Sequence, residues 1–540
     1  MDTKELLNFC IKKGILIDDS VLNLFKDTED VEIVKSIIEK IRGYAQKKII
    51  TKEIFYENKE QFGEFLSEFP KENKSVEKLK IKLGLSIEIL RQKSETLDNF
   101  SIIDQPKQKE SIKNFEIEND FSSVKIISTY SPTDKKIEVK DFVNHFRNRF
   151  KEMKNSLQEY SELNNLVSIN KISGNKQGIS ILGMVYDKKI TKNKNIILEI
   201  EDLTGKIKIL VNQNKQELYK KADDIALDTV IGAKGSGNKD ILFANKIFLP
   251  ETFLFERKKS PVNESILFIS DIHVGSKAFL EKNFLKFVDY LNGKIPNTPE
   301  SEKIKYLFVV GDVVAGIGIY PNQESDLKIQ DLEEQYSKAA ELFGKIRKDI
   351  QIIIIPGNHD CVRLMEPQPI LDEKYAWPLY NLKNITLTTN PSVVNIGAKK
   401  NFSGFNILAY HGFSFLYYAN NIPGLITGKA MKSPDKIMAY LLKNKHLAPT
   451  HTSVQHYPSE KDHLMIRNAP DIFVSGHTHK TGVSYFNNTL IISTSCWEEL
   501  MPYQEKMGFD ADFCKVPMFN LKTREVKMLD FLDSELKNEN

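Results

Sequence analysis

The sequence predicts a multidomain protein: a small N-terminal helical domain, an OB-fold β-barrel, and a layered α/β–α+β domain whose β-sheets are flanked by helices. Three observations predict this fold class. The chain has 540 residues, whereas one domain usually has about 100–200. The hydrophobic period changes along the chain from helical to alternating. Beyond residue 264, apolar runs of strand length alternate with helical stretches, which is typical of buried sheets covered by helices.

The first 60 residues show the apolar spacing of short helices. The stretches DDSVLNLFK and EDVEIVKSIIEKI place apolar residues three and four positions apart, behind aspartates that suit helix caps. We therefore expect an N-terminal helical domain over residues 1–60. Residues 61–135 are rich in Lys and Glu and poor in periodic apolar residues, which predicts a disordered charged linker.

A helix and then a barrel are expected in the middle of the chain. Residues 136–160 place five apolar side chains on one helix face, namely Phe142, Phe146, Phe150, Met153 and Leu157. Residues 161–250 contain short Ile- and Val-rich runs split by turns, with a hairpin expected at Thr204-Gly205. About five strands favour a small closed barrel of the OB-fold type. Such a barrel is either a structural platform or a binder of single-stranded nucleic acid, and no clear row of stacking aromatics decides between them.

The composition narrows the function classes. The 76 Lys and Arg balance 73 Asp and Glu, so any surface that binds nucleic acid must be local. No apolar run reaches the roughly 18 residues that cross a bilayer, and the polar start MDTKELLNFC is unlike a secretory segment. The cysteines form no C-x-x-C pair, which argues against a zinc knuckle. We expect a cytoplasmic protein with reduced thiols and no membrane partner.

Metal-competent side chains follow five of the expected strands in residues 251–540. Each motif alone is weak, because a polar turn or a packed core histidine explains it equally well. In layered α/β sheets, however, ligands bind at the carboxyl ends of strands, so all five motifs can meet at one rim. The motifs are Asp271-Ile272-His273, Gly311-Asp312, Gly357-Asn358-His359-Asp360, His411-Gly412 and Gly476-His477-Thr478-His479.

These ligand types suit two adjacent divalent cations. Carboxylate, imidazole and amide groups bind Mn²⁺, Fe²⁺, Zn²⁺ or Mg²⁺. Asp312 stands alone after its strand and is the expected bridge between the two ions. We expect Asp271, His273 and His479 to complete one ion, and Asn358, His411 and His477 to complete the other. Two such cations polarise a phosphoryl group and lower the pKa of a bridging water, which predicts hydrolysis of a phosphate ester.

Three further residues receive roles near the Asn358 turn. His359 need not bind metal and is the expected acid that protonates the leaving oxygen. Asp360 is expected to orient His359. Arg363 follows the same turn and is the candidate for a substrate phosphate contact.

The motifs resemble the calcineurin-like metallophosphoesterase pattern D-x-H, G-D, G-N-H-D, H-G and G-H-x-H. The segments GDVVAGIGIYPNQ, PGNHDCVR, NKHLAPT, PDIFVSGHTH and CWEELMPYQEKMGF further resemble the small subunits of archaeal DNA polymerase D. This resemblance implies a calcineurin-like phosphodiesterase domain over 251–540 and a proofreading 3′→5′ exonuclease that releases nucleoside monophosphates, with manganese favoured. It also implies two partners, a large subunit with the polymerase active site and DNA, as a single strand or a primer 3′ end.

One position departs from the family pattern. The family pattern at this point is G-D-x-x-D, and in this chain Ala315 stands at the last position of the motif. In the superfamily that carboxylate supports the catalytic histidine, so we expect intact metal binding but a less well oriented His359, with activity reduced by roughly 10–100-fold. Two alternatives stay open, namely a phosphatase or nucleotidase of the same superfamily and a scaffold subunit without catalysis.

Overall fold

The computed structural model describes residues 124–131, 136–500 and 510–532, and isolated positions between 6 and 50. The chain divides into two units, Met1–Ile117 and Glu118–Asn540. In the first unit, residues 34–40 are helical and β1 (Leu16–Ile17) pairs in parallel with β2 (Ile49–Ile50). The helical domain over 1–60 therefore stays a prediction, and residues 61–123 of the expected linker lie outside the described residues.

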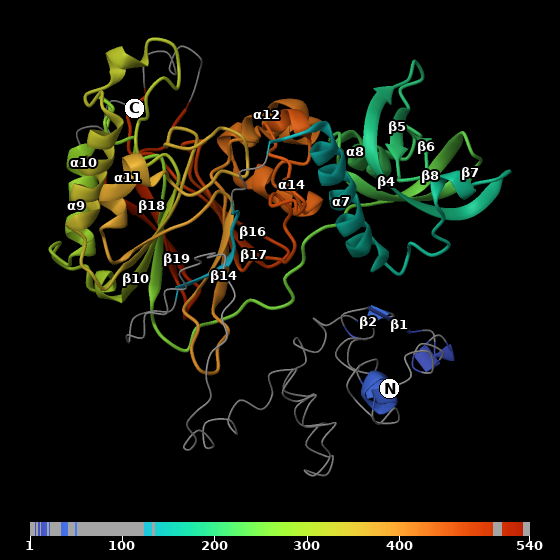
Figure 1. The fold of residues 1–540 in the computed structure, drawn as a ribbon, viewed down its shortest axis with the longest axis horizontal. Coiled ribbons are helices and arrows are strands. Elements are labelled where there is room, and N and C mark those ends of the chain that lie inside the picture. Colours follow the sequence, from blue (N-terminus) through green and yellow to red (C-terminus); the bar gives the residue numbers. More distant parts are fainter. Residues whose placement is uncertain are drawn as a thin grey trace, which may run out of the picture. The chain divides into compact units, whose positions relative to one another are not determined.

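Two six-stranded sheets pack face to face in the second unit (Figure 1). The first sheet has the order β12 (Ile385–Leu387), β11 (Gln351–Ile355), β10 (Ile304–Val310), β9 (Ser265–Ile269), β18 (Lys515–Asn520) and β19 (Val526–Asp530). The second has the order β16 (Gly482–Phe486), β17 (Thr489–Ser493), β15 (Ile472–Ser475), β14 (Phe405–Ala409), β13 (Ser392–Ile396) and β3 (Val124–Ser128). Both central strand sets are parallel, so several carboxyl ends share one edge.

Helices cover the outer faces of this sandwich. On β10, Leu307 and Val309 belong to the core cluster shared with α9 (Glu281–Leu291) and α10 (Leu332–Gly344), whereas Phe308 belongs to the cluster between the sheets. Burial of both faces explains why the strand is apolar from Leu307 to Val310. The other helices are α11 (Glu373–Tyr380) on the first sheet, and α12 (Phe415–Asn421), α13 (Pro423–Thr427) and α14 (Asp435–Asn444) beside the second. The expected layered domain is confirmed.

One part of the expected linker is instead a strand. Residues Val124–Ser128 form β3, which pairs antiparallel with β13 at the edge of the second sheet. Alternate side chains are half-buried, and Val124 packs against the core between the sheets. The prediction that the linker runs to residue 135 is therefore wrong, because β3 finds its partner more than 250 residues further along the chain.

Residues 176–248 of the second unit form a closed barrel with the strand order β4-β5-β6-β8-β7. Its elements are β4 (Lys176–Ile190), β5 (Ile196–Glu201), β6 (Lys206–Val211), α8 (Gln216–Asp223), β7 (Val230–Gly237) and β8 (Ile241–Phe248). The expected hairpin is present, since β5 and β6 pair antiparallel and Asp202 accepts hydrogen bonds from the Thr204 and Gly205 amides. Assignment of this barrel to the OB-fold class remains a prediction.

Helix α7 (Val139–Gln158) joins the barrel to the sandwich. Phe150, Met153 and Leu157 are buried against the barrel, on the face that the sequence predicts. On another face, His145 and Arg149 are buried against the segment that carries Asp462. Within the described part of the chain, no helix combines the length and the apolar content needed to cross a membrane.

Candidate metal centre and active site

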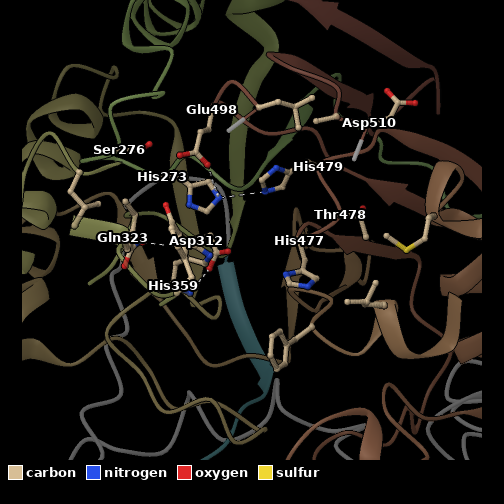
Figure 2. Close-up of a pocket in the computed structure, with 18 residues that line it drawn as sticks. His273, Ser276, Asp312, Gln323, His359, His477, Thr478, His479, Glu498 and Asp510 are labelled. Atoms are coloured by element: carbon tan, nitrogen blue, oxygen red, sulfur yellow. Dashed lines mark hydrogen bonds and ion pairs between the residues drawn. The ribbon is translucent and has the colours of Figure 1, made fainter. Parts of the chain in front are cut away.

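The five motifs meet at one rim of the sandwich, where β9, β10, β11, β14 and β15 end. Figure 2 shows His273, Asp312, His359, His477 and His479 converging on one pocket. This pocket has a volume of about 280 Å³. Strands far apart in the sequence therefore bring the expected ligands together, as their parallel arrangement requires.

The first ligand group consists of Asp271, His273 and His479, whose ligand atoms all lie within 4.8 Å of one another. The fully buried Oδ1 of Asp271 accepts no hydrogen bond, although Nε2 of His479 lies 3.4 Å away and Nε2 of His273 4.0 Å away. The other oxygen accepts from the His477 amide and from the Ser270 hydroxyl. A buried carboxylate oxygen without a donor is costly. Its position among imidazole nitrogens fits a divalent cation.

The second ligand group consists of Asp312, His411 and His477, again with all ligand atoms within 4.8 Å. Nδ1 of His411 lies 2.9 Å from the carbonyl oxygen of Val310, to which it donates. That bond leaves Nε2 as the nitrogen that faces the other ligands. It lies 3.2 Å from Asp312 Oδ2 and 3.0 Å from Asn358 Oδ1. Asp312 also lies within 4.8 Å of His273 and His359 ligand atoms. It thus stands between the two groups, where the sequence predicts the bridge.

The backbone at this rim adopts an unusual conformation. Five expected ligands have positive φ angles, although none is glycine: Asp271 (50°), His273 (54°), Asp312 (51°), His477 (67°) and His479 (54°). The left-handed region costs roughly 1–2 kcal/mol per L-residue and persists mainly where surrounding structure enforces it, often at functional sites. Gly357 is required for a different reason, because a Cβ there would collide with the Asp312 carboxylate.

Charges within the pocket prepare these ligands for a cation. Burial opposes ionisation of Asp271, but the neighbouring His479 outweighs it and lowers the Asp271 pKa to about 2. Burial likewise opposes the charge on His411, yet Asp312 raises the His411 pKa to about 10. Burial and the charge on His411 lower the His477 pKa to about 3. At neutral pH the carboxylates are therefore ionised, and a bound cation would displace the His411 proton.

His359 is oriented by the backbone of the residue that departs from the family pattern. Its Nδ1 donates to the Ala315 carbonyl oxygen at 2.8 Å, and its amide donates to Asp312 Oδ1 at 2.8 Å. The buried Gln323 holds the same carbonyl through its Nε2 at 2.9 Å. His359 therefore has a backbone acceptor in place of the missing carboxylate, and the expectation that it is less well oriented than in the family stays a prediction.

Asp360 and Arg363 do not make the contacts that the sequence predicts. The Asp360 carboxylate accepts from the amides of Gly357 (2.8 Å) and Val313 (3.1 Å) and from the Tyr336 hydroxyl (3.1 Å). It joins two motif loops rather than orienting His359, and that prediction is corrected. The Arg363 guanidinium stacks 3.7 Å from the centre of the Tyr457 ring and donates to the Pro367 carbonyl. It does not line the pocket, so this geometry does not support a phosphate contact.

The structure adds residues that sequence reasoning missed. Oε2 of Glu498 lies 3.9 Å from Nε2 of His273, and Cys496 lies beside His479. Both follow β17, a sixth strand that ends at this rim. The apolar run TLIIST at residues 489–494 is the sequence signal of that strand, and its polar continuation was the available sign of further site residues. On the other side of the pocket, the Phe413 ring packs against His477.

The fold and this metal-type rim define a calcineurin-like phosphoesterase domain. The calcineurin-like phosphoesterase family matches residues 264–481, which carry the five motifs and most of both sheets. This match confirms the superfamily predicted from the motifs.

Most of the chain matches a narrower family. It is 36% identical over 444 residues to the DNA polymerase II small subunit of Methanothermobacter thermautotrophicus, covering 81% of this chain and 89% of that protein. It is also 36% identical over 434 residues to the DNA polymerase II small subunit of Pyrococcus abyssi, covering 78% and 68% respectively. The chain belongs to the DNA polymerase II small-subunit family, which confirms the resemblance predicted from the sequence.

Proposed function

We propose that this chain is the small subunit of a heteromeric replicative DNA polymerase and acts as its proofreading 3′→5′ exonuclease. It hydrolyses DNA phosphodiester bonds to nucleoside monophosphates with two divalent cations, Mn²⁺ favoured. The main support is the geometry around Asp312, which joins two ligand groups and lies next to His359. Such a pair of sites suits in-line hydrolysis of a phosphate ester.

Each side chain at the rim has a definite task in this proposal. Asp271, His273 and His479 would hold one cation, Asn358, His411 and His477 would hold the other, and Asp312 is the ligand that the two groups would share. Cations held there would supply the Lewis acidity that polarises a phosphoryl group and lowers the pKa of a water. His359, fixed through Nδ1 by the Ala315 carbonyl, keeps Nε2 available to give a proton to the leaving oxygen. Asp360 keeps the Asp312 and Asn358 loops at a fixed separation.

The partners of this proposal follow from the family. Relatives carry the name small subunit, so we propose that a large subunit with the polymerase active site binds this chain. The substrate is a single strand or a primer 3′ end. Two other functions remain as outcomes of the test: a phosphatase or nucleotidase, and a scaffold subunit without catalysis.

The test is Mn²⁺-dependent digestion of 5′-end-labelled single-stranded DNA by the chain alone and with its large subunit. We expect His359→Ala to lower the rate by about 10²–10⁴-fold while metal content is kept. Asp312→Ala should lose both activity and metal. His451→Ala, at an exposed histidine outside the rim, is the matched control and should retain activity.

Three results would reject the exonuclease. Equal digestion by wild type and both rim variants would identify a scaffold. Faster hydrolysis of p-nitrophenyl phosphate than of DNA would identify a phosphatase. Products of internal cleavage, in place of a ladder of strands shortened stepwise from the 3′ end, would identify an endonuclease.

A further inference from the structure

A second cavity adjoins the metal-site pocket. Its volume is about 620 Å³, and Ser276 lines both cavities. Ser276 follows the ligand His273 by three residues, and Figure 2 shows it on the His273 side of the pocket, away from His477. Four lysines and two glutamates supply the charged groups of this second cavity, namely Lys277, Lys282, Lys328, Lys338, Glu281 and Glu499. We call it the lysine groove.

Two of the four lysines form no ion pair within the described ranges, although the groove also contains Glu499, whose amide donates to the Ala278 carbonyl. Glu281 pairs with Lys338 at 2.9 Å and lies 3.8 Å from Lys328. Lys277 instead donates to the Ser325 carbonyl at 2.7 Å, a neutral acceptor, and both Lys277 and Lys282 are exposed. Neither forms an ion pair with another residue in the described ranges. The groove therefore presents positive charge on the side of Lys277 and Lys282.

The opposite side of the metal-site pocket differs in chemistry. There Phe413, Leu416 and Met431 line the wall, and the Phe413 ring packs against His477. An apolar wall suits a nucleobase, whereas a lysine-lined groove suits phosphate oxygens. A polynucleotide whose scissile phosphate sits at the metals must continue away from the pocket, and the groove is the cationic route beside it.

We propose that the lysine groove binds the phosphates of a single-stranded polynucleotide next to the scissile bond, through Lys277 and Lys282. This inference rests on the proposed function and specifies its substrate as a strand, not a free nucleotide. Contacts between lysine and phosphate release condensed counterions, so binding weakens as salt rises, with a slope of about 0.7 per contact on single strands. Two contacts should therefore contribute about 1.4 to the slope of log(kcat/KM) against log salt.

The test compares an oligonucleotide single strand with a dinucleotide, using the full chain with Mn²⁺ and the double variant Lys277→Gln/Lys282→Gln. The salt slope for the long strand should decrease by about 1.4, which makes the loss between about 50 and 200 mM salt roughly sevenfold smaller. The ratio of kcat/KM for the long strand to that for the dinucleotide should fall at low salt. The control is Lys383→Gln, at an exposed lysine before β12, on the edge of the sheet away from the rim.

The outcomes separate the groove from the active site. An unchanged salt slope with intact hydrolysis of the long strand would overturn the groove proposal alone. An equal loss of kcat/KM for the long strand and the dinucleotide would also overturn the groove proposal, because the lysines would then affect the active site or the fold. If free deoxynucleoside monophosphate inhibits wild type but not the double variant, the groove binds a mononucleotide and the strand proposal is wrong. Absence of hydrolysis of either substrate by wild type would instead reject the proposed exonuclease.

Discussion

Two buried clusters in this protein combine histidines with aspartate, but only one has the properties of a metal site. At the rim, imidazoles surround Asp271 and Asp312. In the second cluster, Arg149 lies among the histidines: its Nε donates to Asp462 at 2.6 Å, and its Nη2 is 3.2 Å from His145 and 3.3 Å from His456. A guanidinium thus occupies the place that a metal would need.

The two aspartates show what separates the clusters. Asp462 is satisfied, because Oδ2 contacts Arg149 and His446, and Oδ1 accepts from the Leu464 amide. Asp271 is buried with one oxygen that lacks a donor. Among the described residues, the rim also carries left-handed backbone that the Asp462 cluster lacks. Histidine number is therefore a poor sign of metal binding, and a carboxylate oxygen that lacks a donor and lies among imidazole nitrogens is a better one.

The largest effect is expected for Asp462→Asn, which should reduce the free energy of unfolding by about 3–5 kcal/mol because Arg149 would remain buried without its counter-charge. Urea denaturation measures this change. Glu162→Gln, which breaks an exposed ion pair with Lys246, is the control and should leave the midpoint unchanged. A loss no greater than that of the control would mean that the Asp462 cluster holds a different counter-ion.

Metal addition should separate the clusters directly. Mn²⁺ at about 100 times its Kd should stabilise wild type by about 2.7 kcal/mol, since it binds the folded chain. Asp271→Asn should abolish that gain, whereas Asp462→Asn should retain it. Thermal unfolding with and without Mn²⁺ measures both. A gain lost in Asp462→Asn would show that the second cluster also binds the ion.

Acid should destabilise the Asp462 cluster through its histidines. Burial and Arg149 lower the His446 pKa to about 4, and burial lowers that of His456 well below its usual range. Between pH 6.5 and 4 the unfolded chain binds these protons and the folded chain does not, so stability falls as pH falls. His446→Gln should reduce the slope of the free energy of unfolding against pH by about 1.4 kcal/mol per pH unit. The double variant H446Q/H456Q should reduce it by about twice that amount. Urea unfolding at several pH values measures these slopes. Variants with the same slope as wild type would contradict this assignment.

The rim was predictable because local signals coincide with topology. Each motif follows an apolar run, and parallel strands of one sheet place their carboxyl ends together, so Asp312 and Asn358 of the first sheet could be joined from the sequence, as could His411 and His477 of the second. The Asp462 cluster was not predictable, since Arg149 and Asp462 are more than 300 residues apart and share no motif. Strand β3 was missed for the same reason.

The rest of the site depends on contacts that sequence letters do not encode. A motif comparison registers Ala315 only as a missing carboxylate, whereas its carbonyl oxygen contacts His359. Arg363 was placed by proximity in sequence, but stacking on Tyr457 turns its guanidinium toward that ring. The orientation of His359 and the contacts of Arg363 therefore depend on a backbone acceptor and on side-chain direction, which the residue pattern does not encode.

A smaller effect is expected for Gln323→Leu. The Gln323 amide holds the Ala315 carbonyl, so its loss should let the His359 ring move and lower kcat by about tenfold, within the range for residues that support a catalytic group. KM for DNA and metal content should change little. Gln323→Glu, which keeps the length but removes the donor, should resemble Gln323→Leu, and wild-type rates in both would remove Gln323 from the positioning of His359.

The smallest effect is expected for Ala315→Asp, which restores the carboxylate of the family pattern. If that carboxylate were needed, the substitution would raise kcat by roughly the 10–100-fold associated with a missing supporting group. The Ala315 carbonyl already accepts from His359, however, and Asp312 and Asp360 are close by in the same loop region. A third buried carboxylate would be repelled by both, so we expect no gain and a lower thermal midpoint. Single-turnover rates at saturating Mn²⁺ decide the point, and a rise of tenfold or more would show that a carbonyl is the weaker support for the histidine.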